Sequence, residues 1–213
     1  MGGSTEASKK SILYRDAFLS LKRSFIALAV VMLAASLLAL ALLDDVKLAD
    51  KTVQNIELVT LTDGTPVNAE IFKESQLTVL NVWATFCGPC IHEMPEFGEV
   101  SREYADRGVQ FLGVCGDITY DADGTPNAGL LSDAFDIIVT TKADYPHCMP
   151  TPAYATQLGT LISNSYPGTF IIDENGNILK LYVGAISKDA LVSALETELS
   201  KLQSASSQTG SEG

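Results

Sequence analysis

Two nearly continuous apolar runs stand in the middle of the 213-residue chain. They are Leu77–Trp83 (LTVLNVW) and Val109–Cys115 (VQFLGVC), and such runs are typical of strands buried on both faces of a sheet. The stretch from Cys87 to Arg107 is expected to be a helix, because Gly108 supplies the residue at which helices commonly end in a left-handed conformation. The pattern therefore predicts a β-α-β unit.

Turn signals predict two hairpins, one on each side of that unit. Each joins two short apolar stretches at an Asp-Gly or Asn-Gly pair: Ile56–Leu61 and Val67–Ile71 at Asp63-Gly64, and Thr169–Ile172 and Ile178–Val183 at Asn175-Gly176.

Helical spacing of apolar residues predicts two further helices. The first contains Leu131, Phe135 and Ile138; the second begins after Ser187 and carries Leu191, Leu195, Leu199 and Leu202 on one face. Residues 117–129 are expected to be a polar loop, and Asp144–Met149 a short extended piece. A β-α-β beginning and a β-β-α end indicate an α/β fold with a mixed central sheet flanked by helices.

An uninterrupted apolar run from Ser24 to Leu43 precedes this domain. Twenty residues without charge or proline match the roughly 30 Å hydrocarbon core of a bilayer, so the run predicts a transmembrane helix. Lys22 and Arg23 precede it and Asp44 follows it, which places the N-terminus in the cytoplasm and the domain outside. The alternative is a signal peptide cleaved at the small-x-small sequence 39–41.

The chain is thus expected to comprise five segments: a cytoplasmic segment 1–23, a membrane anchor 24–43, a linker 44–52, a folded domain 53–202 and a disordered tail 203–213. The expected location is a bacterial cell membrane, with a single span and an extracytoplasmic domain. The formal net charge is −12. Such acidity excludes a nucleic-acid partner, which requires a basic face.

Cys87-Gly88-Pro89-Cys90 stands at the predicted strand-to-helix junction. The free N–H groups of a helix N-terminus stabilise a thiolate, so Cys87 is the expected nucleophile and the less accessible Cys90 the resolving cysteine. Pro89 suits the first helical turn, where its missing N–H is not needed. A zinc site is the alternative, but zinc requires two more ligands at similar spacing, and none is evident.

The sequence LNVWATFCGPC at positions 80–90, followed by Glu93-Met94-Pro95, resembles the TlpA/ResA-like thioredoxin family of membrane-tethered thiol–disulfide oxidoreductases. The resemblance continues at Phe111–Val114 and Tyr166–Asp173 and covers roughly residues 53–202. It implies a thioredoxin-like fold with a cis Pro167 facing the cysteines. Residues 149–165 depart from the family pattern, and they lead into the cis-proline loop.

The resemblance also implies that a set of residues supports the active site: Trp83, Gly88, Pro89, Glu93, Tyr166 and Pro167. Glu93 is expected either to raise the thiol pKa by like-charge repulsion or to be a solvated helix carboxylate. Asn81 occupies the position of a buried acid in cytoplasmic thioredoxins, so the chain is expected to manage without that acid. His92 is expected to be exposed.

Cys115 and Cys148 are predicted to form a structural disulfide, because consecutive parallel strands of a crossover are usually neighbours. Two separate buried thiols, or a second redox pair, are the alternatives.

The expected function is extracytoplasmic reduction of protein disulfides, for example in cytochrome c maturation, without a cofactor or bound metal. The expected partners are thiol or disulfide proteins and a membrane electron donor of the thiol–disulfide type. A disulfide-forming oxidant, a peroxidase of related fold and a copper chaperone that uses His147 are the alternatives.

Overall fold

The computed structural model describes Met32 and residues 52–209. The predicted membrane anchor, apart from Met32, and the cytoplasmic segment lie outside these residues. No helix within the described residues is long and apolar enough to cross a membrane. The folded unit falls within Leu48–Gly213.

A seven-stranded sheet forms the centre of the domain, in the order β2-β1-β5-β4-β3-β6-β7. Its strands are β1 (Leu58–Thr60), β2 (Pro66–Val67), β3 (Leu77–Trp83), β4 (Val109–Cys115), β5 (His147–Pro150), β6 (Gly168–Asp173) and β7 (Ile178–Val183). β3, β4 and β5 run parallel, and the other pairs are antiparallel. The prediction of a mixed sheet is therefore confirmed.

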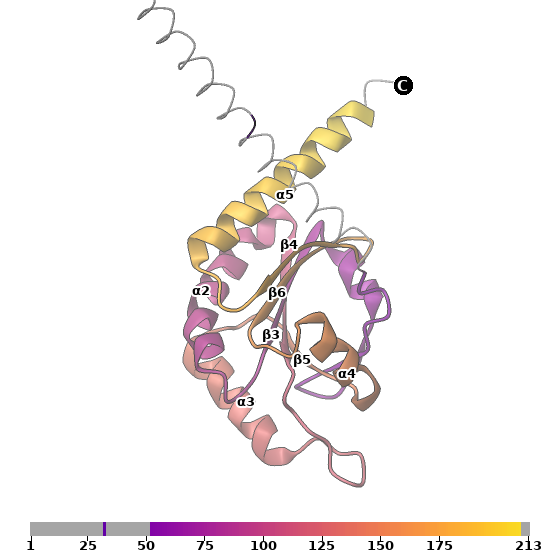
Figure 1. The fold of residues 1–213 in the computed structure, drawn as a ribbon, viewed down its shortest axis with the longest axis vertical. Helices are drawn as coiled ribbons and strands as arrows, with labels where there is room; N and C mark the ends of the chain where they lie inside the picture. Colours follow the sequence, from indigo (N-terminus) through magenta and orange to yellow (C-terminus); the bar gives the residue numbers. More distant parts are fainter. Residues whose placement is uncertain (1–31, 33–51, 210–213) are drawn as a thin grey trace, which may run out of the picture. The chain divides into compact units, whose positions relative to one another are not determined.

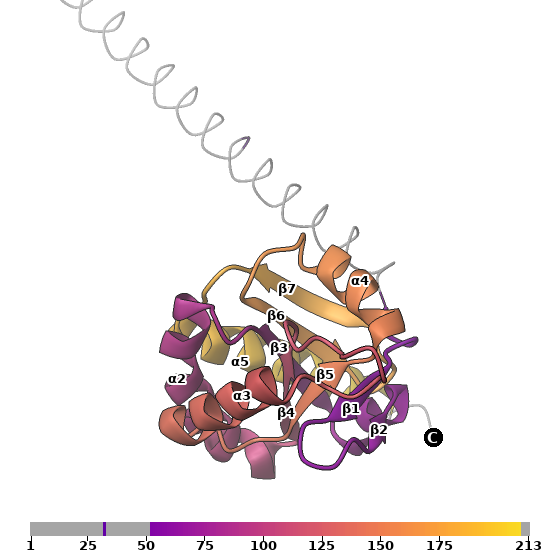
Figure 2. The same cartoon turned by 90° about the horizontal axis from the view of Figure 1, so that it is seen from below.

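Helices cover both faces of the sheet (Figures 1 and 2). One face packs against α2 (Gly88–Tyr104), α3 (Ala128–Thr141) and α5 (Lys188–Thr209), and the other against the 3₁₀ helix η1 (Ala69–Glu74) and α4 (Pro152–Leu161). β3 is buried along its whole length, as expected for a strand with helices on both faces.

The helix that carries the cysteines begins and ends as the sequence predicts. Cys87 is the N-cap, and its Sγ accepts a hydrogen bond of 3.3 Å from the backbone N–H of Cys90. A 3₁₀ turn η2 (Ala105–Arg107) follows, and Gly108 ends it at φ 75°. A side chain with a Cβ is disfavoured at that φ, which explains the glycine.

Three segments differ from the prediction. The second arm of the first hairpin stops at Val67, because Asn68 caps η1 by accepting a hydrogen bond from Glu70 N–H. Residues 149–165 contain α4, which starts at a Thr151 N-cap followed by Pro152. α5 continues to Thr209, so residues 203–209 are helical and not part of a disordered tail.

Candidate active site

A disulfide joins Cys87 and Cys90 at the start of α2, with their Cα atoms 5.3 Å apart. Cys87 is 6% exposed and Cys90 is fully buried. Gly88 and Pro89 between them are exposed. A protein substrate can therefore reach the sulfur of Cys87, whereas the sulfur of Cys90 is accessible only to Cys87. This difference is consistent with the predicted roles of Cys87 as nucleophile and Cys90 as resolving cysteine.

Asp117 holds the loop that precedes the disulfide. Its carboxylate accepts hydrogen bonds from the backbone N–H of Thr85 (3.1 Å) and from the Thr85 hydroxyl (2.6 Å). The thiol of Cys115 also donates to Asp117, at 3.2 Å. Asp117 lies in the loop after β4 and was not identified from the sequence, since a lone aspartate in a polar loop carries no specific signal.

Glu93 lies one turn beyond Cys90 on α2 and is 4% exposed. Its two carboxylate oxygens accept hydrogen bonds of 3.1 Å, one from the side-chain amide of Asn81 and one from the backbone N–H of Ile186. Burial raises the pKa of Glu93 to about 7, although these two hydrogen bonds act in the opposite direction. The alternative of a solvated carboxylate is therefore wrong.

Asn81 lies on β3 beneath α2 and is fully buried. Its amide also donates to the Thr169 hydroxyl at 3.2 Å, and its Oδ1 has no partner among the described residues. The strand itself carries no acid at this position, but a buried carboxylate lies beside Asn81. The acid comes from α2, as Glu93, and the strand supplies the amide that holds it.

Tyr166 and Phe86 contact each other beside the disulfide, with ring centroids 5.9 Å apart in an edge-to-face arrangement. The Tyr166–Pro167 bond is cis, as predicted. Phe86 immediately precedes Cys87 and is 74% exposed. A Cβ on Gly116 would lie 2.6 Å from the Tyr166 hydroxyl, so a glycine there leaves room for the ring. The cis-proline loop and the cysteine loop thus form one surface.

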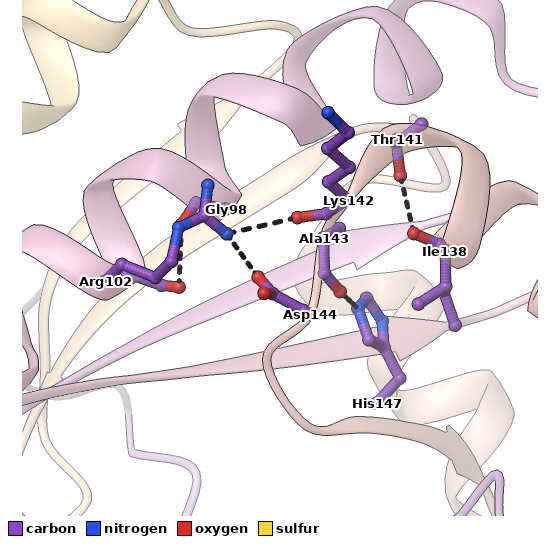
Figure 3. Close-up of polar contacts among 9 residues, drawn as sticks. Gly98, Arg102, Ile138, Thr141, Lys142, Ala143, Asp144 and His147 are labelled. Carbon is purple, nitrogen blue, oxygen red and sulfur yellow. Dashed lines mark hydrogen bonds and ion pairs between the residues drawn. The ribbon is translucent and has the colours of Figure 1, made fainter.

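Trp83 is fully buried and belongs to the same apolar cluster as Cys87 and Cys90. Its indole N–H donates to Nδ1 of His147 at 3.2 Å. Nε2 of His147 contacts the carbonyl oxygen of Ala143 at 2.9 Å (Figure 3). Both nitrogens of the ring are engaged, so His147 has no free lone pair for copper. Within the described part of the chain, no group of three or more His, Cys, Asp or Glu residues is placed to hold a metal.

Cys115 and Cys148 are free, buried thiols, so the predicted structural bridge between them is wrong. Cys148 pairs with Val114 across the β4–β5 ladder. Adjacent residues of a strand point to opposite faces, so Cys115 points away from Cys148. Accordingly, Cys115 belongs to the core under α2 and Cys148 to the core under α4. Burial raises the pKa of both thiols, that of Cys148 to about 12.

His92 is exposed on α2, as predicted. The elements therefore bring together Cys87, Cys90, Trp83, Glu93 and Tyr166-Pro167, the residues that the sequence motif assigns to the site. His147 and Asp117 join them from segments outside that motif.

Comparison with known proteins agrees with this geometry. Residues 48–199 match the Redoxin family. The chain is 28% identical over 120 residues to the thioredoxin-like protein YneN of Bacillus subtilis, and 32% identical over 123 residues to the thiol-disulfide oxidoreductase ResA of Geobacillus thermodenitrificans. These matches cover 56% and 55% of this chain and 64% and 60% of the relatives, less than two thirds of their length.

Solved structures show the same fold. A thioredoxin-family thiol:disulfide interchange protein from Chlorobium tepidum is 25% identical, with a TM-score of 0.54 over 70% of this chain and 97% of that one. The predicted similarity to ResA-like proteins is thus confirmed. Because the family match covers most of the chain and includes the cysteine pair, this chain belongs to the Redoxin family.

Proposed function

We propose that this protein is a thiol–disulfide oxidoreductase that reduces disulfides of exported proteins, such as apocytochrome c. The observation that carries the proposal is the Cys87–Cys90 disulfide at the N-terminus of α2, with one sulfur near the surface and the other buried. The names of the ResA-like relatives and the shared fold support the same class of reaction.

The reaction takes place in two exchanges. In the first, the thiolate of reduced Cys87 attacks a client disulfide, the client S–S bond breaks, and one client sulfur leaves as a thiolate that takes a proton from water. In the second, Cys90 loses its proton and attacks Cys87, which breaks the mixed disulfide and releases the second client thiol. Two electrons pass to the client, and the protein is left with the Cys87–Cys90 disulfide.

Glu93 is the group that accepts the proton of Cys90 in the second exchange. It lies one helical turn from Cys90, and its pKa of about 7 allows it to take up and release a proton near neutral pH. Water cannot easily do the same, because Cys90 is fully buried.

The exposed ring of Phe86 and the half-buried ring of Tyr166 form the surface on which the client lies. The backbone of Tyr166, next to cis Pro167, is placed to pair with an extended client segment. A client of this kind brings its own disulfide against Cys87.

The proposal includes a place in the cell. The apolar segment 24–43 anchors the protein in a bacterial membrane, the domain lies outside the cytoplasm, and a membrane thiol–disulfide donor reduces Cys87–Cys90 again. Protease added to spheroplasts should digest the domain, and the protein should sediment with membranes. A soluble chain that begins near Leu42 would show instead that the segment is a cleaved signal.

Insulin reduction tests the chemistry. Cys87→Ser should abolish insulin reduction by dithiothreitol-recycled protein, whereas Cys90→Ser should accumulate a mixed disulfide with the client. Equal trapping by the two variants would contradict the assigned roles, and an inactive wild-type protein would contradict the proposed function.

A further inference from the structure

A row of three polar residues and one glycine crosses the sheet beneath α2. Thr169 on β6 pairs with Asn81 on β3, Asn81 pairs with Gly113 on β4, and Gly113 pairs with His147 on β5. All four lie on the face that carries the cysteine helix, since the next residues along their strands belong to the opposite core. Asn81 in this row donates a hydrogen bond to Glu93. His147, at the other end of the row, is a buried polar residue that the proposed exchange reaction does not use.

The hydrogen bonds of His147 determine its tautomer. A carbonyl oxygen only accepts, so Nε2, which contacts the Ala143 oxygen, carries the hydrogen. An indole N–H only donates, so Nδ1 offers its lone pair to Trp83. Both bonds require a neutral ring, because a proton on Nδ1 would face the indole hydrogen. Burial lowers the pKa of His147 to about 4, which keeps the ring neutral near pH 7.

The backbone on both sides of Ala143 is held against α2 (Figure 3). Gly98 of α2 approaches the backbone of Lys142 so closely that a Cβ there would overlap the Lys142 carbonyl. Arg102, one turn further on, donates to that carbonyl and forms an ion pair with Asp144. The helix that carries the cysteines therefore also positions the acceptor of His147.

Contacts on both sides hold the imidazole ring in place. Tyr145 stacks on it, with ring centroids 4.5 Å apart and 25° between the planes. On the sheet below, Gly113 has no side chain, and a Cβ at that position would overlap the His147 ring. His147 is 8% exposed. The orientation of the Nδ1 lone pair is therefore set by the fold and not by solvent.

The partner of that lone pair is close to the redox chemistry. Trp83 is the last residue of β3, is four positions before Cys87 and packs in the cluster that contains both cysteines. Its own carbonyl accepts from the N–H of Gly116, which anchors its backbone at 2.8 Å. The hydrogen bond to His147 adds a directional contact at the N–H edge of this packed ring.

We propose that His147 is a positioning residue for the Cys87–Cys90 couple: it accepts the indole hydrogen bond of Trp83 and holds this ring in one orientation in the buried cluster around the two sulfurs. The proposal builds on the proposed function, because it concerns the reactivity of the same cysteine pair. His147 acts only through Trp83 and does not touch the client.

The hydrogen bond can be observed directly, whatever the activity of the protein. The chain contains a single tryptophan, so a ¹⁵N-labelled sample has one indole N–H signal. This signal should show a coupling through the hydrogen bond to Nδ1 of His147, and Nε2 should carry a proton. Absence of the coupling, or a proton on Nδ1, would overturn the proposal.

The effect on reactivity is measured as the rate at which dithiothreitol reduces the Cys87–Cys90 disulfide. His147→Leu removes the acceptor. The reduction rate should then differ from the wild-type rate about fivefold in either direction, as expected for the loss of one buried hydrogen bond. His147→Gln keeps an acceptor oxygen and should stay within about twofold of wild type. In a Trp83→Phe background, His147→Leu should have no further effect, because its partner is absent.

Two results would overturn the proposal. One is an equal effect of His147→Leu with and without Trp83; the other is an unchanged rate in the folded Leu variant. If His147→Leu does not fold, the proposal is tested by the reduction rate of His147→Gln and by the coupling between Trp83 and His147 in the wild-type protein. A wild-type protein that fails to reduce insulin contradicts the proposed function alone, since dithiothreitol reduction does not require a protein client.

Discussion

The amide of Asn81 donates to the carboxylate of Glu93 across the interface between the central strand and the cysteine helix, at 3.1 Å. An amide and an acid on two different elements thus form one buried polar pair, one turn from the resolving cysteine. Because burial raises the pKa of Glu93 to about 7, its charge changes in the pH range where thiol exchange takes place. Two of the following predictions depend on this change.

The first prediction concerns the activity of Glu93→Gln. The variant cannot accept the proton of Cys90, so insulin reduction at pH 7 should fall at least about tenfold. The ratio of wild-type to variant rates should rise with pH around pH 7, because Glu93 is an acceptor only when ionised. Glu103→Gln, an exposed position on the same helix, is the control. A pH-independent ratio would contradict the role of Glu93.

The second prediction concerns stability. The pKa of Glu93 is raised from 4.5 to about 7, so between these values the native state holds a proton that the unfolded state has lost. The free energy of unfolding contributed by Glu93 should therefore decrease as pH rises from 4.5 to 7, by up to about 3 kcal/mol. Glutamine does not ionise, so the free energy of unfolding of Glu93→Gln should not show this decrease. The variant should therefore become more stable relative to wild type as pH rises from 4.5 to 7.

Urea denaturation of the oxidised proteins at several pH values measures the difference. The lowered pKa of His147 gives the opposite slope, since its stabilising contribution is lost as pH falls from 6.5 toward 4. That contribution is common to both proteins and cancels in the difference. Parallel curves for the two proteins would show that Glu93 has an ordinary pKa.

The third prediction concerns Phe86. The ring is 74% exposed, so Phe86→Ala should change the free energy of unfolding by less than about 0.5 kcal/mol. It should raise KM for insulin about three- to tenfold, because the client loses an aromatic contact, and leave reduction of glutathione disulfide unchanged. Val139→Ala, an equally exposed apolar position on α3, should change neither. Equal losses of activity toward insulin and glutathione disulfide would show that Phe86 affects the exchange reaction itself and not client binding.

The fourth prediction concerns the free cysteines. Cys115 and Cys148 are buried on opposite faces of the sheet. Oxidised native protein should therefore take up almost no iodoacetamide, whereas oxidised protein in guanidinium chloride should be alkylated at both residues. Peptide mapping identifies the labelled cysteines. Failure to label them in denaturant would show that a bridge between them exists.

The sequence predicted the elements whose signals are local. The runs LTVLNVW and VQFLGVC marked the two central strands, and Gly108 marked the end of the cysteine helix. The redox motif, through its family resemblance, also predicted the cis bond at Pro167. α4 was missed, although Thr151-Pro152 is a helix-start signal, because its apolar spacing is short and weak.

The wrong prediction of a Cys115–Cys148 bridge has its cause in strand register. One residue of shift on β5 moves a side chain to the other face of the sheet, and it was this register that separated Cys148 from Cys115. The same register places His147 beside Trp83, which the sequence did not reveal. The burial of Glu93 depends on the β7–α5 loop, whose Ile186 N–H meets the carboxylate, and no local pattern contains that information.

The reduction potential of the Cys87–Cys90 couple tests the central claim most directly. Cys90 is fully buried and lies one turn from Glu93, and both features disfavour a thiolate in the reduced protein. Strong oxidants owe their potential to a stabilised reduced form. Equilibration of the domain with glutathione buffers should therefore give a potential more reducing than about −200 mV. A value near about −120 mV would contradict the account and identify the protein as a disulfide-forming oxidant.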